Sequence, residues 1–305
     1  MKAIVCSPRG FCAGVERAIE VVERALAKFG APVYVRHEIV HNRVVVEDLV
    51  ERGAVFVEEL SQVPTGAPVV FSAHGVEPKV YEEASTLALP QIDATCPLVT
   101  KVHVEARSFA KRGFTILLIG HREHVEVVGV VGEAPDQTLV IADAEGAEKV
   151  EVEDPEKVAV LTQTTLSLDE AQAVMAVLLR RFPKLEAPRS SDICYATTNR
   201  QSAVKERLGD VDLWLVLGDP TSSNSNRLAE IGASRGAPSY LILGSEEIDP
   251  AWLENVETIG ITSGASTPEI SVQSVLDHLR ALGAEVEELG GVEEVLEFQL
   301  PREVQ

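Results

Sequence analysis

Short apolar runs alternate with longer amphipathic segments along the whole chain. Between Val15 and Leu26, apolar residues recur at the i, i+3, i+4 and i+7 spacing of an amphipathic helix, and Gly30 favours a helix end. Ser167 and Glu170 form a capping-box pattern ahead of a further helix. Similar patterns predict helices at 44–50, 98–112, 167–182 and 227–235 and from 267 onward.

The apolar runs between these helical patterns have the length of strands. We predict twelve strands, at Lys2–Cys6, Val33–Arg36, Ala54–Val57, Val69–Ser72, Gln91–Asp93, Thr115–Ile119, Thr138–Ile141, Val158–Leu161, Glu186–Arg189, Leu213–Leu217, Tyr240–Leu243 and Thr258–Ile261. Because strands alternate with helices, the sequence predicts an α/β fold with mainly parallel sheets.

The twelve predicted strands divide into three groups of four. This grouping predicts three similar small α/β domains, each with a four-stranded sheet, at residues 1–95, 96–193 and 194–281. The remaining residues, 282–305, are rich in glutamate. We expect them to form an acidic, solvated tail that packs across one domain.

Composition and charge narrow the possible partners. The chain has 305 residues, 45% of them hydrophobic and 25% charged, and no apolar run approaches the ~20 residues that span a bilayer. Its start lacks the length of a signal peptide, so we expect a cytoplasmic protein. The net charge of −21 argues against nucleic acid or an anionic membrane as a partner. A small anionic substrate is compatible with it, because local backbone N–H, His, Ser and Asn groups can bind phosphate.

Polar residues collect after the predicted strands, where parallel sheets bind their ligands. They are Cys12, His41, His74, Cys96, His121, His124, Glu126, Thr164, Thr165, Cys194, Ser222, Ser223, Asn224 and Ser266. If the three domains face one another, these loops line one central cavity.

Three of the four cysteines, Cys12, Cys96 and Cys194, each follow a predicted strand and precede a predicted helix. A helix N-terminus favours a thiolate, and thiolates bind zinc, copper(I) or iron–sulfur clusters. Four-iron clusters usually take four cysteines, so three would leave one iron available as a Lewis acid for substrate oxygen. No Cys-x-x-Cys pair typical of structural zinc is present. Cys6 lies inside a predicted strand and fits a small buried hydrophobe.

The other polar residues allow more than one interpretation. His121 and His124 fit either zinc ligands or a polar loop, whereas His37, His103 and His278 fit ordinary surface or packing residues. The groups at predicted helix starts fit helix caps one at a time, but together they favour a phosphate or diphosphate site. These groups are His41, His74, Ser222, Ser223, Asn224 and Ser266. Glu126 is placed to donate a proton, and Thr164 or Thr165 to hold a substrate hydroxyl.

Several motifs closely resemble the 4-hydroxy-3-methylbut-2-enyl diphosphate reductase family, over roughly residues 1 to 282. They are Arg9-Gly10-Phe11-Cys12-Ala13-Gly14-Val15, Ser72-Ala73-His74-Gly75-Val76, Asp93-Ala94-Thr95-Cys96-Pro97, Thr162-Gln163-Thr164-Thr165, the stretch from Asp192 to Gln201, Ser222 to Leu228, and Gly264-Ala265-Ser266-Thr267-Pro268.

The resemblance implies a trefoil of three α/β domains around an oxygen-sensitive [4Fe-4S] cluster, one per chain. It implies Cys12, Cys96 and Cys194 as the cluster ligands, Glu126 as the proton donor and Thr164 as the residue that orients the substrate hydroxyl. It implies a diphosphate site made of His41, His74, His124, Ser222, Ser223, Asn224 and Ser266. The implied reaction is a two-electron reductive dehydroxylation that yields isopentenyl and dimethylallyl diphosphates, with ferredoxin or flavodoxin as electron donor and a monomeric enzyme.

Two positions depart from the family pattern. The family often has proline after the histidine equivalent to His124, where this chain has Val125, and a Ser-Lys type sequence where this chain has Asp219-Pro220. The first change affects the loop carrying Glu126. The second puts a carboxylate near the expected diphosphate site, so its direction matters.

Two other functions fit the same residues. An iron–sulfur hydro-lyase would remove hydroxide without net reduction, and would be active without any reductant. A zinc- or cluster-holding sensor would bind a phosphorylated ligand and catalyse nothing, and one zinc per colourless chain would support it.

Overall fold

The computed structural model describes all 305 residues, which separate into two compact units. Unit 1 comprises residues 1–15, 41–47 and 195–297, and unit 2 comprises 16–40, 48–194 and 298–305. The chain therefore passes from one unit to the other five times. Helices α1 (Ala13–Phe29) and α2 (Arg43–Glu51) each begin in the ranges of unit 1 and continue into those of unit 2.

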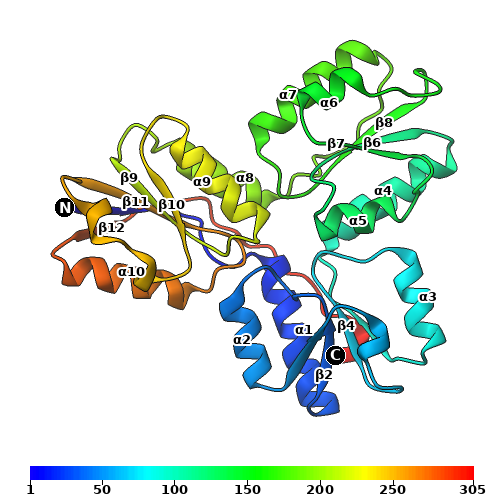
Figure 1. Cartoon of the computed structure of the whole chain (residues 1–305), viewed down its shortest axis with the longest axis horizontal. Coiled ribbons are helices and arrows are strands. Elements are labelled where there is room, and N and C mark those ends of the chain that lie inside the picture. The colour runs from blue at the N-terminus through cyan, green and yellow to red at the C-terminus, as the bar shows by residue number, and fades with distance from the viewer. The chain divides into compact units, whose positions relative to one another are not determined.

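Unit 1 contains one five-stranded parallel sheet. Its strand order is β10 (Ser239–Ile242), β9 (Leu213–Leu217), β11 (Thr258–Ser263), β1 (Lys2–Val5) and β12 (Glu285–Glu288). Helices α8 (Tyr195–Lys205) and α9 (Ser223–Ala233) cover one face, and α10 (Glu269–Ala281) covers the other (Figure 1). Every residue of β9 is buried, because both faces of the sheet are covered by helices.

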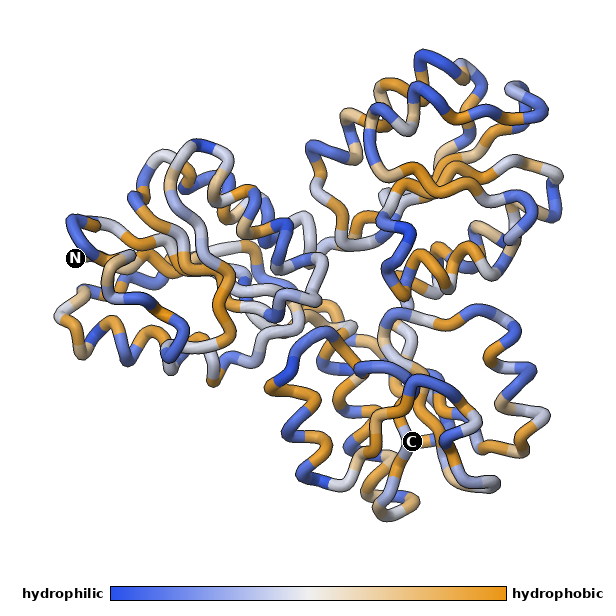
Figure 2. The backbone as a smooth tube through the Cα atoms, in the orientation of Figure 1, coloured by the Kyte–Doolittle hydropathy of each residue, from blue (hydrophilic) through white to orange (hydrophobic).

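Unit 2 contains two further parallel sheets. The first has the order β3 (Ala54–Val57), β2 (Val33–Arg36), β4 (Val69–Phe71), β5 (Gln91–Asp93), and the second β7 (Thr138–Ile141), β6 (Thr115–Ile119), β8 (Val158–Thr162). Its other helices are α3 (Pro78–Thr86), α4 (Pro97–Lys111), α5 (Val125–Val131), α6 (Ala144–Lys149) and α7 (Leu168–Arg181). Apolar residues follow the strands of each sheet (Figure 2), and the three-stranded sheet has an apolar core on each face.

The predicted helix signals are confirmed where local chemistry defines them. Ser167 Oγ accepts a hydrogen bond from the Glu170 N–H (3.4 Å) at the start of α7, and Gly30 ends α1 with a φ of +78°. Helix α9 begins at Ser223, four residues before the predicted Arg227, because Ser222 caps it. The remaining helical turns are short 3₁₀ segments at Leu60–Gln62, Ser245–Glu247, Pro250–Leu253 and Arg302–Val304. None of the helices combines the length and the apolar character needed to span a bilayer.

The predicted α/β class with three parallel sheets is confirmed, but the grouping of strands by fours is wrong. The sheets have five, four and three strands. β1 pairs with β11 from the far end of the chain, and β12 lies in the segment expected to be a solvated tail. The predicted strand Glu186–Arg189 is reduced to one bridge, between Ala159 and Glu186. The domain boundaries at 95/96, 193/194 and 281/282 stay a prediction.

Candidate active site

Glu126 is the one carboxylic acid among the predicted site residues, and it is deeply buried, with 2% of its surface exposed. It lies in the first turn of α5, where the His124 Nδ1 caps the helix by accepting the Glu126 N–H (3.2 Å). Thr164 donates twice to its carboxylate, from the backbone N–H to Oε1 (2.6 Å) and from Oγ1 to Oε2 (2.9 Å).

Burial and hydrogen bonding act in opposite directions on this carboxyl group. Burial raises the pKa of Glu126 to about 6, and the two hydrogen bonds from Thr164 limit the rise because they favour the carboxylate. A carboxyl group with this pKa is protonated in a useful fraction of molecules near neutral pH. It is therefore suited to donate a proton to a bound ligand.

Thr164 also links Glu126 to a predicted cluster ligand. The N–H of Cys194 donates to the Thr164 carbonyl (3.0 Å), just before α8 begins. Of the two candidate threonines, Thr164 donates two hydrogen bonds to Glu126, and the Thr165 hydroxyl accepts from Gln163 Nε2 (3.0 Å). The geometry thus favours Thr164 over Thr165 as the partner of the proton donor.

The predicted histidines of unit 2 lie side by side. The rings of His74 and His124 have centroids 5.9 Å apart and are nearly perpendicular. The N–H of Cys96 donates to the carbonyl of Ala73 (2.9 Å), which brings the Cys96 loop against the His74 turn. In unit 2, a continuous set of contacts therefore connects Cys96, His74, His124, Glu126, Thr164 and Cys194.

The predicted anion-binding residues of unit 1 gather at the start of α9. Asn224 is 5% exposed, and both its Nδ2 and its Oδ1 are buried without a hydrogen-bond partner. A Cβ at Gly264 would lie 3.1 Å from Asn224 Nδ2, so the loop after β11 packs closely on this helix end. From that loop, Ser266 Oγ donates to the carbonyl of His41 (2.9 Å). An unpaired buried amide beside a helix N-terminus and serine hydroxyls is suited to a polar, anionic ligand.

Cys12 lies in the same unit, between β1 and α1. Its N–H donates to the Ala265 carbonyl (3.3 Å), next to Ser266. Burial raises the pKa of the Cys12 thiol, while the N–H groups of Val15 and Gly14 at the helix start act against the rise. Cys6 is different, since burial raises the pKa of its thiol to about 12. Cys6 therefore stays an uncharged, buried thiol, in line with the small buried hydrophobe expected from the sequence.

The structure answers the question raised by Asp219. Its Oδ1 accepts from the N–H (2.9 Å) and hydroxyl (2.7 Å) of Thr221, and its Oδ2 accepts from the Arg43 N–H (3.1 Å). Burial opposes ionisation, but these hydrogen bonds hold the pKa of Asp219 below its usual value. The carboxylate thus has partners of its own and holds the loop that follows His41.

Val125, the other departure, leaves the local structure intact. It is the first residue of α5, a position where proline is tolerated but not required, because His124 already caps the helix. Glu126 therefore keeps its place on a regular helix.

The three predicted cysteine ligands share one local setting, since each directly precedes a helix: α1, α4 or α8. Cys12 belongs to unit 1, and Cys96 and Cys194 belong to unit 2. Neither unit by itself gathers three His, Cys, Asp or Glu side chains suited to a metal ion.

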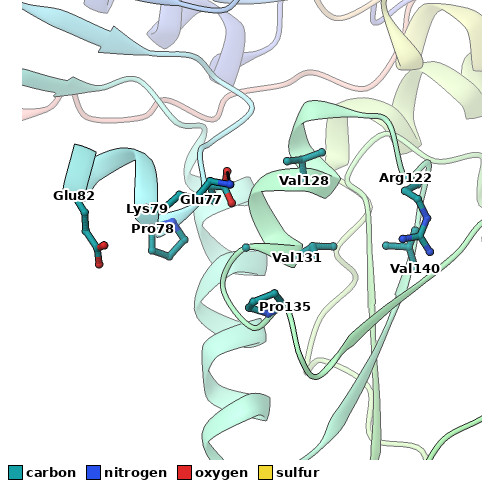
Figure 3. Close-up of a pocket in the computed structure, with 10 residues that line it drawn as sticks. Glu77, Pro78, Lys79, Glu82, Arg122, Val128, Val131, Pro135 and Val140 are labelled. Carbon is teal, nitrogen blue, oxygen red and sulfur yellow. Dashed lines mark ion pairs between the residues drawn. The ribbon is translucent and has the colours of Figure 1, made fainter. Parts of the chain in front are cut away.

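A groove of about 590 Å³ lies elsewhere in unit 2, between the start of α3 and α5 (Figure 3). It is lined by Glu77, Lys79, Arg122, Val128 and Val131 among others, and by none of the predicted site residues. Glu77 pairs with Lys79 at 2.6 Å. We assign this groove no part in the chemistry.

Two buried residues outside the predicted site have contacts that the sequence pattern did not reveal. His103, expected to be an ordinary surface or packing residue, is a buried packing residue whose Nδ1 lies 2.7 Å from Glu133 Oε1. Arg200 is fully buried and pairs with Glu294. The only sequence signal for Arg200 is its place in the stretch from Asp192 to Gln201.

Comparison with known proteins places the chain among close relatives. The family model described as LytB protein matches residues 3–280. A 4-hydroxy-3-methylbut-2-enyl diphosphate reductase of Azoarcus sp. (strain BH72) is 52% identical over 303 residues, which cover 99% of this chain and 97% of the relative. The enzyme of the same name from Zymomonas mobilis is 53% identical over 99% of this chain and 89% of its own length.

Solved structures agree with these relatives. The E-1-hydroxy-2-methyl-but-2-enyl-4-diphosphate reductase of Plasmodium falciparum matches with a TM-score of 0.94 and 39% identity, over 99% of this chain and 96% of that one. A second solved structure is described as (E)-4-hydroxy-3-methyl-but-2-enyl diphosphate reductase, the terminal enzyme of the non-mevalonate pathway. It matches with a TM-score of 0.64 and 29% identity, over 92% of this chain and 100% of that one.

Proposed function

This chain belongs to the LytB protein family, and we propose that it reduces 4-hydroxy-3-methylbut-2-enyl diphosphate to isopentenyl and dimethylallyl diphosphates. This reaction is the last step of the non-mevalonate isoprenoid pathway. The single observation that carries the proposal is the buried Glu126 carboxyl group, bonded twice by Thr164 and placed next to the loops of His124 and Cys194.

The overall reaction sets what the protein must provide. The allylic alcohol takes up two electrons and two protons, its C–O bond breaks, and the hydroxyl group leaves as water. The second proton is added to one of two carbons of the allyl group, which gives the two products. The protein must therefore supply a proton at the hydroxyl, hold the diphosphate and admit electrons.

Glu126 is the proposed proton donor to the departing hydroxyl, and Thr164 is the proposed partner that orients this hydroxyl. The raised pKa of Glu126 keeps the acid form available, and its two hydrogen bonds fix the carboxyl group. The burial of the pair also excludes water from the proton being transferred.

The diphosphate is proposed to bind His41, Ser222, Ser223, Asn224 and Ser266 of unit 1 and His74 and His124 of unit 2. The unpaired amide of Asn224 supports this assignment, since a buried polar group without a partner is costly unless a ligand satisfies it. Binding energy from the diphosphate would position the reacting end of the substrate.

Cys12, Cys96 and Cys194 are the proposed ligands of one [4Fe-4S] cluster per chain. Their positions ahead of helix N-termini fit the thiolate ligands that such a cluster requires. A bound cluster would relay the electrons from the reductant to the substrate, and three protein thiolates would leave one iron without a protein ligand. Ferredoxin or flavodoxin as donor, a monomeric state and a cytoplasmic location remain predictions.

The decisive experiment is anaerobic purification followed by iron and sulfide analysis and by turnover of the hydroxylated allylic diphosphate. We expect about four irons and four sulfides per chain, and formation of both products only with reduced ferredoxin or dithionite. Activity without reductant would instead support a hydro-lyase. A colourless chain with one zinc and no turnover would support the ligand-binding sensor.

A further inference from the structure

Arg200 is a fully buried charge that lies against the loop carrying Cys12. From the middle of α8, its Nη2 donates to the carbonyl oxygens of Gly10 (2.7 Å) and Phe11 (3.4 Å). Its side chain has no exposed surface. The two residues immediately before Cys12 are thus both bound by one guanidinium group.

Glu294 neutralises this guanidinium from the C-terminal segment. Its carboxylate oxygens lie 3.1 and 3.2 Å from Arg200 Nη1, and it also accepts from Asn199 Nδ2 (2.9 Å). The Glu294 side chain is 12% exposed. Removing one partner of such a buried ion pair strongly destabilises the folded protein, because the other charge remains buried and unpaired.

The C-terminal segment passes close to the same loop at a second position. A Cβ added at Gly291 would lie 2.1 Å from the carbonyl oxygen of Ser7, so only glycine permits this approach. The contact places residues just before Glu294 along the start of the Cys12 loop. The segment expected to be a solvated tail is therefore part of the support for this loop.

We propose that Arg200 and Glu294 are positioning residues that hold the Gly10–Cys12 loop in the conformation in which Cys12 binds the cluster. That Cys12 binds an iron–sulfur cluster is taken from the proposed function. Without Glu294, the unpaired Arg200 charge is drawn toward water, and the carbonyl groups of Gly10 and Phe11 lose their donor. The loop then opens locally while the sheet beneath it remains folded.

Hydrogen exchange in the cluster-free full chain tests the loop directly. In Glu294→Ala we expect the amides of residues 9–15 to exchange at least about tenfold faster than in the wild type. The amides of α10, on the opposite face of the sheet, should be unchanged. The matched control is Glu293→Ala, because Glu293 is exposed and adjacent in sequence. Equal exchange of residues 9–15 in wild type and Glu294→Ala would overturn the proposal.

A milder variant keeps the test valid if Glu294→Ala does not fold. Glu294→Gln keeps the shape and one acceptor oxygen but removes the charge, so its loop exchange should lie between those of wild type and Glu294→Ala. If only Glu294→Gln folds, it must still exchange faster than Glu293→Ala at residues 9–15. Exchange equal to that control contradicts the positioning role.

The anaerobically reconstituted holoenzyme separates this proposal from the proposed function. We expect a chelator to remove iron about tenfold faster from Glu294→Ala than from wild type or Glu293→Ala, with an altered electron paramagnetic resonance spectrum of the reduced cluster. A wild-type chain that binds no cluster overturns the proposed function, whatever the exchange result. If the chelator removes iron from wild type as fast as from Glu294→Ala, the positioning role is overturned but the proposed function is not.

Discussion

At the residue scale, Glu126 shows how a carboxyl group is kept protonatable inside a protein. Burial alone would favour the neutral acid, whereas the two hydrogen bonds that Thr164 donates partly stabilise the carboxylate. Because only the protonated form can donate, a pKa of about 6 means that the supply of the acid form decreases as the pH rises above this value.

We expect kcat to fall as pH rises above about 6, since Glu126 then loses its proton. Glu126→Gln should lower kcat by roughly 10² to 10⁴-fold and abolish this pH limb, with little change in KM for the diphosphate substrate. Steady-state rates between pH 5 and 8 with a chemical reductant would measure both effects. A variant that keeps the limb would remove Glu126 from the role of proton donor.

The same raised pKa has a consequence for stability. A carboxyl group whose folded pKa lies above the unfolded value favours the folded state at low pH, and this contribution is lost as pH rises through about 6. The unfolding free energy of wild type should therefore fall relative to Glu126→Gln between about pH 4 and pH 7. Chemical denaturation at several pH values would measure this difference. If the unfolding free energies of wild type and Glu126→Gln change in parallel with pH, the prediction is wrong.

Two features require a glycine at position 75, next to His74: its backbone conformation and the closeness of the His103 ring. The φ of Gly75 is +78°, and an added Cβ would lie 2.9 Å from His103 Nε2. We expect Gly75→Ala to destabilise the fold by about 2–4 kcal/mol, from backbone strain and overpacking together, and to raise the substrate KM by displacing His74. Urea unfolding and steady-state kinetics would measure the two effects.

Gly66→Ala is the matched control for Gly75→Ala. Gly66 has a φ of +81° but nothing within 4 Å of an added Cβ, so this variant carries the backbone strain without the clash. It should cost only about 1–2 kcal/mol. Equal losses of stability in the two variants would show that His103 yields freely, despite its contact with Glu133 (2.7 Å).

At the element scale, the N-terminus of α9 holds polar side chains whose roles differ by position. Asn224 has an unpaired buried amide, whereas Asn226 Nδ2 donates to the carbonyls of Pro220 (2.7 Å) and Ser222 (2.9 Å). The first residue is available to a ligand, and the second holds the helix start.

We therefore expect Asn224→Ala to raise the substrate KM by about tenfold or more without lowering the unfolding free energy, because no protein hydrogen bond is lost. Asn226→Ala should instead lower the unfolding free energy by about 1 kcal/mol. Kinetics and thermal unfolding of both variants would distinguish the roles. Loss of stability in Asn224→Ala with an unchanged KM would argue that the amide is structural.

The elements themselves were predictable where an apolar run or a cap defines them. Strands such as β6 and β9 follow from continuous buried apolar residues, and α7 follows from its Ser167 cap. β12 was missed because three of its four residues are glutamate, so no apolar pattern marks it. It forms at the edge of the sheet, where it pairs with β1 through the backbone; its three glutamates are exposed, and only Val286 packs against the core.

At the scale of the whole molecule, the sequence predicted that polar loops after parallel strands lie near one another, but not which strands pair. Residues after parallel strands were expected to meet, and within each unit they do, as His74 with His124 and Ser266 with His41 show. Alternation of apolar and polar residues carries no information about partners far along the chain, so the pairing of β1 with β11 and β12 could not be read from it.

The last eight residues, 298–305, belong to unit 2, where they pack on α1. Arg17 Nε donates to the Gln299 carbonyl (2.7 Å), Lys28 Nζ donates to the Glu303 carbonyl (2.7 Å), and Val304 is 3% exposed. Deleting 298–305 should lower the unfolding free energy by about 2–3 kcal/mol, mainly through Val304. Calorimetry would measure the loss. Val295→Ala, at an 80% exposed position, is the control, and a deletion as stable as this control would contradict the prediction.

The central position of β1 between β11 and β12 also has a consequence for synthesis on the ribosome. Strand β1 has no neighbour in its sheet until more than 250 further residues have been translated, because β11 begins at Thr258 and β12 at Glu285. The Cys12 loop that follows β1 therefore reaches its native setting only after β11 and β12 have been translated. Any metal centre that uses this loop should therefore be loaded only after the ribosome has made these two strands.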